Sequence, residues 1–173
     1  GLYNPGIYHD PMPYANIPRM DRENFYRDTF EFSDKTKKYA LSKIKSVLTA
    51  LGCSYSCTYC YVSSLIDNLR EAYSEVGMRP PSIIQDRLIE TVVQEGEEIL
   101  ALDKIYGVKT TAVFDQADIS LNNMHWWKQL KNLWVERVGI PFYIQARPAM
   151  LAGKKGQQRI KLISDKGLVA GIS

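Results

Sequence analysis

The chain contains few of the residues that bind metals or form cross-links. Its 173 residues include two histidines, His9 and His125, and three cysteines. Three cysteines cannot all pair as disulfides. Neither histidine has the spacing that would complete a structural zinc site, which needs four ligands. The low count therefore argues against a disulfide framework and against a zinc-finger module.

Long apolar runs and a strong charge excess are also absent. No apolar run approaches the roughly 18 residues that a membrane span needs. The 22 basic and 19 acidic residues leave a net charge of +3, which is no nucleic-acid signature. The first residues, 1–5, match neither a signal peptide nor a transit peptide. An apolar content of 45% is ordinary for a globular domain.

All three cysteines lie within eight residues. Cys53, Cys57 and Cys60 have the spacing Cys-x3-Cys-x2-Cys and directly follow the apolar segment 44–50. Closely spaced Cys thiolates hold the irons of iron–sulfur clusters. Three of them would leave the fourth iron of a cubic cluster without a protein ligand. An open metal position is where a catalytic site takes its substrate or cofactor.

This loop resembles the cluster loop of the radical SAM superfamily, and Tyr59, just before the third cysteine, matches the family's pattern. The resemblance implies that Cys53, Cys57 and Cys60 hold a 4Fe-4S cluster. It implies that the open iron binds S-adenosylmethionine, and that one electron cleaves this cofactor to methionine and a 5′-deoxyadenosyl radical. That radical abstracts hydrogen from a substrate. An external electron donor of flavodoxin or ferredoxin type is implied too. Tyr59 is a candidate to stack on adenine, with ordinary packing as the alternative.

From Lys43 onward the pattern alternates between strands and helices. Strands are predicted at 44–50, 108–114, 140–146 and 168–172. Helices are predicted at 64–76, after a capping box at Ser82-x-x-Gln85, at 123–138 and at 157–166. The helix at 123–138 is expected to end at Gly139 and to bury one stripe of residues, namely Trp126, Trp127, Leu130, Leu133 and Trp134. Alternation of this kind, without a hairpin signal, predicts an α/β fold with parallel strands. The radical SAM resemblance implies a partial TIM-like (β/α) barrel, here truncated after the fourth parallel strand.

Polar residues follow two of the later predicted strands. In parallel α/β folds, ligands bind at the carboxyl ends of the strands. Asp115 and Asp118 follow the second strand and are candidates for the amino group of S-adenosylmethionine, because carboxylates accept charge-assisted hydrogen bonds. A helix N-cap is the alternative for Asp118. Arg147, after the third strand, is a candidate anchor for a carboxylate, with a solvated loop arginine as the alternative.

Residues 1–40 form a segment rich in proline and aromatic residues, which predicts an extended connector that packs on other structure, with a short helix near residues 21–29. The segment 17–22 resembles the connector between an upstream cobalamin-binding domain and a radical SAM core. Asp118, Asn123 and Trp126 resemble a motif of the same cobalamin-associated branch. We therefore expect residues 41–173 to be the N-terminal part of a radical SAM core, with cobalamin a candidate cofactor of the longer protein.

The leading functional hypothesis is a radical SAM enzyme that methylates, cyclises or rearranges unactivated carbon in a small-molecule or lipid-like substrate. A non-catalytic iron–sulfur protein for electron transfer or structure is the alternative, and a zinc-binding interaction module is the third. Unpaired thiolate ligands indicate a reducing, cytoplasmic compartment. Since an edge strand would lie open at 168–172, we expect residues 1–173 to be inactive as an enzyme on their own.

Overall fold

The computed structural model describes residues 19, 21–24, 26–27, 43–53, 55, 57–79, 84–115, 117 and 123–172. Its centre is a parallel sheet of four strands, in the order β1-β4-β5-β6. The strands are β1 (Ile44–Val47), β4 (Ala112–Asp115), β5 (Phe142–Ile144) and β6 (Val169–Ile172). They follow one another across the sheet in chain order, so every connection between neighbours is a crossover of the same kind. The predicted α/β class is confirmed.

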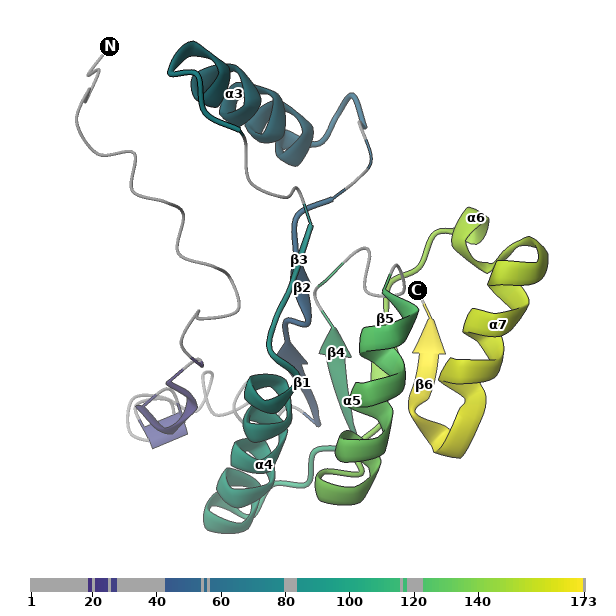
Figure 1. The fold of residues 1–173 in the computed structure, drawn as a ribbon. Coiled ribbons are helices and arrows are strands. Elements are labelled where there is room, and N and C mark those ends of the chain that lie inside the picture. Colours follow the sequence, from purple (N-terminus) through teal and green to yellow (C-terminus); the bar gives the residue numbers. More distant parts are fainter. Residues whose placement is uncertain are drawn as a thin grey trace.

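Within the described residues after β1, five α-helices accompany the strands. They are α3 (Tyr61–Glu75), α4 (Ile89–Tyr106), α5 (Met124–Arg137), α6 (Pro148–Leu151) and α7 (Gly153–Ser164). Helices α4, α5 and α7 lie side by side along the sheet, whereas α3 stands away from it beyond the carboxyl ends of the strands (Figure 1). No helix in the described parts of the chain is long and apolar enough to cross a membrane.

The main core lies between the sheet and the helices. Val113 and Phe142 are register partners on neighbouring strands, and both are fully buried. Trp127 and Trp134 of α5 contact the Phe142 ring, with centroid distances of 5.4 and 4.5 Å. This burial confirms the prediction that the tryptophans of α5 are core residues. The prediction that Leu133 belongs to the same buried stripe is wrong, because Leu133 is 36% exposed.

A second, two-stranded sheet was not predicted. Strand β2 (Ala50–Leu51) pairs antiparallel with β3 (Gln85–Asp86). The predicted strand 44–50 is therefore two short strands with a break at residues 48–49. The predicted capping box is also wrong at Gln85, which lies in β3. Helix α4 begins only at Ile89, after Leu88, with no side-chain cap. Pairing between residues 34 and 36 positions apart in the chain decided this boundary, and the local capping pattern does not show it.

The other predicted elements differ mainly at their ends. Helix α5 begins after Asn123 and ends before Gly139, as predicted, and Gly139 has the positive φ (70°) of a helix-ending glycine. The predicted helix 157–166 begins earlier, because Gly153–Ser164 forms α7 and Pro148 opens the short α6. Pro favours a first helical position because it needs no N–H partner there.

Part of the predicted connector, 1–40, is described. Residues 22–24 and 26–27 are helical, in agreement with a predicted short helix near residues 21–29. Tyr26 and Arg22 are buried. The Tyr26 ring lies 5.5 Å from that of Tyr106 at the end of α4, and the Lys45 ammonium lies 4.7 Å from its centroid. Arg22 and Tyr26 therefore pack against β1 and α4.

Candidate functional site

The three cysteines lie on the loop that joins β2 to α3, at the carboxyl end of the first strands. Each thiol is free and half-buried. Gly52 opens the loop with φ of 89°, a conformation that costs glycine little. Cys60 is the residue before the first turn of α3. The loop therefore lies at the edge of the sheet where ligands of parallel α/β folds bind.

Main-chain hydrogen bonds hold the second half of this loop. The Cys60 N–H donates to the Cys57 carbonyl at 3.1 Å. The Ser63 hydroxyl, one turn into α3, donates to the same carbonyl at 3.1 Å. At the start of the loop, the Tyr55 N–H lies 3.5 Å from the Cys53 sulfur. The loop geometry is thus tied to the first turn of α3.

Arg147 contacts this loop from the end of β5, which is two strands away from β1 in the sheet. It follows β5 and precedes Pro148 of α6. Its Nη2 donates to the Cys57 sulfur at 3.2 Å, and its guanidinium lies 4.1 Å from the centroid of the Tyr55 ring. The hydrogen bond to Cys57 is the main cause that raises the pKa of Arg147, with burial opposing it. The structure therefore places this predicted site residue against a predicted metal ligand.

Asp115 is held inside the molecule. It ends β4, is fully buried, and accepts hydrogen bonds from Thr49 and Ala117. The Thr49 N–H and the Ala117 N–H each lie 3.1 Å from Oδ1, and the Thr49 hydroxyl lies 2.6 Å from Oδ2. These bonds join the end of β4 to the break between β1 and β2. They support a role for Asp115 in shaping the loop that leads to the cysteines.

The other candidates lie apart from this cluster. The Tyr59 side chain is 88% exposed on the turn before Cys60, and no described neighbour stacks on it. Asp118 lies outside the described residues. Asn123 caps α5, because its side-chain oxygen accepts from the Trp126 N–H at 3.1 Å. The Trp126 indole donates to the Arg87 carbonyl at 2.8 Å. Asn123 and Trp126 therefore have structural partners.

The chemistry of the donor set fits an iron–sulfur cluster. Thiolate is the ligand that these clusters use, and three free thiols stand on one short loop with a cationic side chain beside one of them. Within the described residues, no three His, Cys, Asp or Glu side chains already surround a common point that would suit a metal ion. The three cysteine sulfurs are thus free to bind a metal, but in this structure they do not surround a common point.

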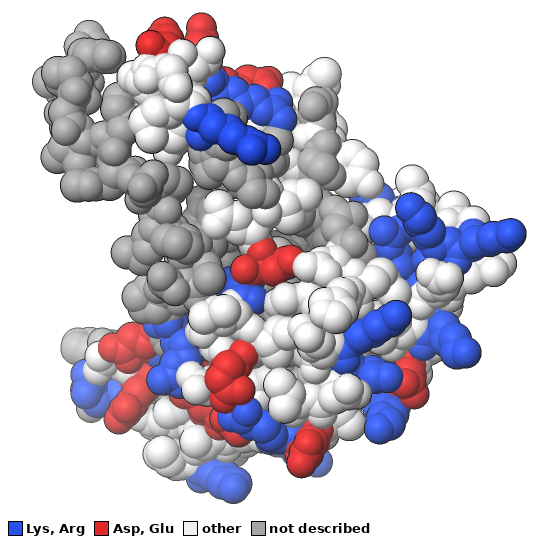
Figure 2. Space-filling model, viewed as in Figure 1, with Lys and Arg blue, Asp and Glu red and all other residues white. Residues whose placement is uncertain are grey.

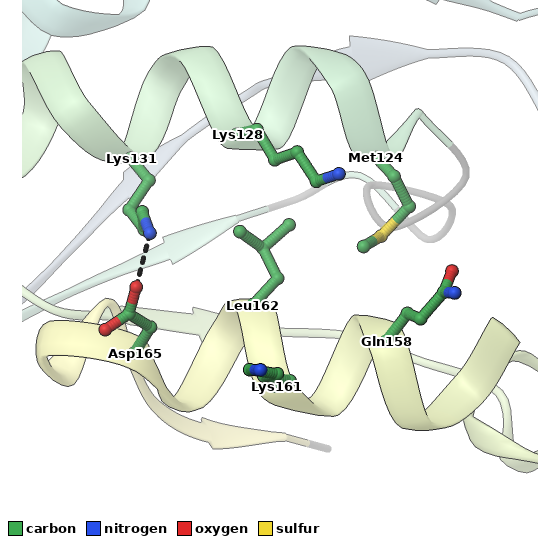
Figure 3. A pocket seen from close by; sticks show the side chains of 7 residues that line it. All are labelled: Met124, Lys128, Lys131, Gln158, Lys161, Leu162 and Asp165. Atoms are coloured by element: carbon green, nitrogen blue, oxygen red, sulfur yellow. Dashed lines mark hydrogen bonds and ion pairs between the residues drawn. The ribbon is translucent and has the colours of Figure 1, made fainter. Parts of the chain in front are cut away.

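A cavity of about 440 Å³ lies elsewhere, between α5 and α7 (Figure 3). It is lined by Met124, Lys128, Lys131, Gln158, Lys161, Leu162 and Asp165. The Lys131 ammonium donates to the Asp165 carboxylate across it. Basic residues also gather on the surface beside α6 and α7 (Figure 2). None of the predicted site residues lines this cavity.

Two residues of the cysteine site were not singled out from the sequence. Thr49 gives two hydrogen bonds to Asp115, and Tyr55 provides the face on which Arg147 lies. Tyr55 had a local signal, since an aromatic residue between two clustered cysteines can stack on a cation. Thr49 had none, because its partner lies 66 residues away. Comparison of the chain with protein-family models, curated proteins and solved structures found no match.

Proposed function

We propose that this chain is part of a radical SAM enzyme, in which Cys53, Cys57 and Cys60 hold a 4Fe-4S cluster. The observation that carries the proposal is the cysteine loop itself. Three free thiols lie on the loop at the carboxyl edge of the parallel sheet. Arg147, which follows the third parallel strand, β5, donates a hydrogen bond to one of them. When bound, such a cluster supplies the electron that cleaves S-adenosylmethionine to methionine and a 5′-deoxyadenosyl radical.

The surrounding residues have separate tasks in this proposal. The cysteines provide three thiolates, and metal binding couples to the ordering of its ligand loop, so loading is expected to draw their sulfurs together. Arg147 uses one N–H on Cys57, and its other N–H groups are available to a cofactor carboxylate. Tyr59, on the exposed turn, is the candidate to cover adenine. Asp118 remains the candidate for the cofactor amino group, since the carboxylate of Asp115 is already occupied by Thr49 and Ala117.

The fold supports the same proposal. Four parallel strands in chain order, with helices α4, α5 and α7 along them, are the arrangement expected of the first units of a TIM-like (β/α) barrel. We further propose that residues 1–40 connect this core to a cobalamin-binding domain, that an external donor of flavodoxin or ferredoxin type reduces the cluster, and that the protein works in the reducing cytoplasm.

Anaerobic reconstitution with iron and sulfide tests the proposal. The chain should take up about four irons, and each of the single variants Cys53→Ala, Cys57→Ala and Cys60→Ala should lose most of them. Ser64→Ala, an exposed substitution on α3, is the matched control and should load fully. Addition of S-adenosylmethionine should then change the electron paramagnetic resonance spectrum of the reduced protein.

The outcomes separate the competing functions. If the protein takes up iron but its electron paramagnetic resonance spectrum does not change when S-adenosylmethionine is added, it is a non-catalytic iron–sulfur protein. Zinc uptake that depends on the cysteines, without iron uptake, would indicate a zinc-binding module. Iron retained in a triple Cys→Ala variant would rule out the cysteine assignment. In the longer protein, release of 5′-deoxyadenosine after addition of a reductant would establish the reaction class.

A further inference from the structure

Arg147 is held beside Cys57 at two points. The residues are 90 positions apart in the chain, yet Nη2 of Arg147 lies 3.2 Å from the Cys57 sulfur. The plane of the guanidinium is supported by Tyr55, whose ring centroid lies 4.1 Å from Cζ. A long side chain stacked on an aromatic face loses less freedom when it forms a hydrogen bond. The position of the Arg147 guanidinium is thus fixed by two contacts, one with the Cys57 sulfur and one with the Tyr55 ring.

We propose that Arg147 tunes the reduction potential of the cluster that Cys57 would help to hold, by donating a hydrogen bond to the Cys57 sulfur. This inference rests on the proposed function. Hydrogen bonds to the sulfurs and the net charge nearby are among the factors that set the potential of iron–sulfur clusters. Reduction adds one negative charge, and a cationic donor stabilises the reduced form more than the oxidised form. Arg147 therefore makes the cluster easier to reduce.

The residue type suits this task. Arginine stays charged at all working pH values and presents a planar group with five donors, whereas lysine has a compact ammonium that does not stack in the same way. Among the described residues, only Cys57 accepts a hydrogen bond from Arg147. The remaining donors are free to hold an anionic group of a bound cofactor at the same time. Arg147 is then placed to link that group to the sulfur.

A redox titration followed by electron paramagnetic resonance tests the inference on the reconstituted chain. Iron per chain is measured first for wild type, Arg147→Gln and Arg147→Lys. At a fixed solution potential, Arg147→Gln should lower the ratio of reduced to oxidised cluster about tenfold, in line with the worth of one hydrogen bond to a charged group. A tenfold change corresponds to about 59 mV for one electron. Arg147→Lys, which keeps the charge, should shift less.

Three further variants separate tuning of the potential from general damage to the fold. Arg70→Gln removes the same charge from α3, where Arg70 pairs with the exposed Asp67, and should leave the potential unchanged. Tyr55→Leu removes the stacking face and should shift the potential in the same direction as Arg147→Gln. Tyr55→Phe keeps the ring and should match wild type.

The result that overturns the inference is an unchanged potential in Arg147→Gln and Tyr55→Leu, both loaded with iron as wild type. If Arg147→Gln fails to load, Arg147→Lys and Tyr55→Leu decide the matter by the same measurement. Failure of the wild-type chain to take up iron would instead overturn the proposed function. The two failures are therefore distinguishable.

Discussion

At the scale of single residues, Asp115 is the clearest case of a buried polar group with a structural task. From Thr49 its carboxylate accepts two hydrogen bonds and from Ala117 one, counting donors in the described part of the chain. A buried donor left without its acceptor costs about 1–3 kcal/mol. We expect Asp115→Ala to lower the free energy of unfolding by about 3 kcal/mol and Thr49→Val by about 1 kcal/mol. Urea denaturation measures both.

The same pair of variants distinguishes the two roles considered for Asp115. If it served mainly to bind cofactor, Asp115→Ala would weaken S-adenosylmethionine binding while the midpoint of urea unfolding stayed at the wild-type value. A fall in that midpoint for both Asp115→Ala and Thr49→Val supports the structural role, because only that role involves Thr49.

Tyr26 predicts a specific dependence of stability on pH. Burial, and to a lesser degree the charge of Asp103, raise the pKa of Tyr26 from 10.0 to about 12, with Arg22 opposing them. A pKa raised by folding means that the protonated phenol favours the folded state. Its contribution is complete below pH 10 and is lost as the pH rises from about 10 to about 12. The loss is at most about 3 kcal/mol.

The measurement is urea unfolding of wild type and Tyr26→Phe across this pH range. The phenylalanine variant lacks the titrating group, so its curve should fall less steeply than that of wild type. Parallel curves would contradict the prediction, because other groups that titrate in this range are common to both proteins.

At the scale of elements, the approach of α4 to α5 depends on one glycine. A Cβ on Gly96 of α4 would lie 2.7 Å from the Trp134 ring and 2.8 Å from a methyl of Val138. Outside this contact, Arg137 of α5 donates to Glu97 of α4 at 2.8 Å, which lowers the pKa of Glu97. The two helices therefore approach closely at Gly96, and the ion pair between Glu97 and Arg137 joins them at the edge of this contact.

We expect Gly96→Ala to destabilise the fold by about 1–2 kcal/mol. Overpacking costs about 1–3 kcal/mol, and the better helix propensity of alanine returns up to about 1 kcal/mol. In a Val138→Ala background the added methyl has more room, so Gly96→Ala should cost less there, and thermal or urea unfolding of all four proteins gives this coupling. Equal costs in both backgrounds would show that the Val138 contact is not responsible.

At the scale of the whole molecule, a buried ionic group joins segments that are distant in the chain. Glu95 of α4 pairs with Arg87 at 2.9 Å and with Arg22 at 3.7 Å. Arg87 also donates to the Leu48 carbonyl, and Arg22 to that of Ser46. All three ionic side chains are nearly inaccessible to water. Glu95 thus links Arg22, the first strands and α4.

We expect Glu95→Gln to lower the free energy of unfolding by about 3–5 kcal/mol, because it removes the carboxylate with which both buried guanidinium groups pair. Amide hydrogen exchange in residues 21–27 should also become faster. Glu97→Gln, on the same helix, is the matched control. The ion pair of Glu97 with Arg137 is partly exposed, so water and salt screen it and Glu97→Gln should cost much less than Glu95→Gln. Equal costs for the two variants would contradict a special role for Glu95.

The sequence predicts much of this molecule where the signal is local. The Val- and Thr-rich segment around Val113, the apolar face of α5 and the glycine at 139 each identify an element within a few residues of its observed place. The cysteine spacing is local as well, and it directs attention to one loop. Asp115 and Arg147 were selected by a general rule about the ends of parallel strands, and the structure places both at that edge of the sheet.

Only the tertiary structure decides which groups meet. The antiparallel pairing of β2 with β3 overrides the capping pattern at Gln85, because residues 34 and 36 positions apart in the chain pair there. Asp115 finds its donors across 66 residues, and Arg147 finds Cys57 across 90. Helix and strand periods, caps and ligand spacings act over a few residues and can be read from the chain. Partners such as these depend on how the crossovers bring strand ends together in space.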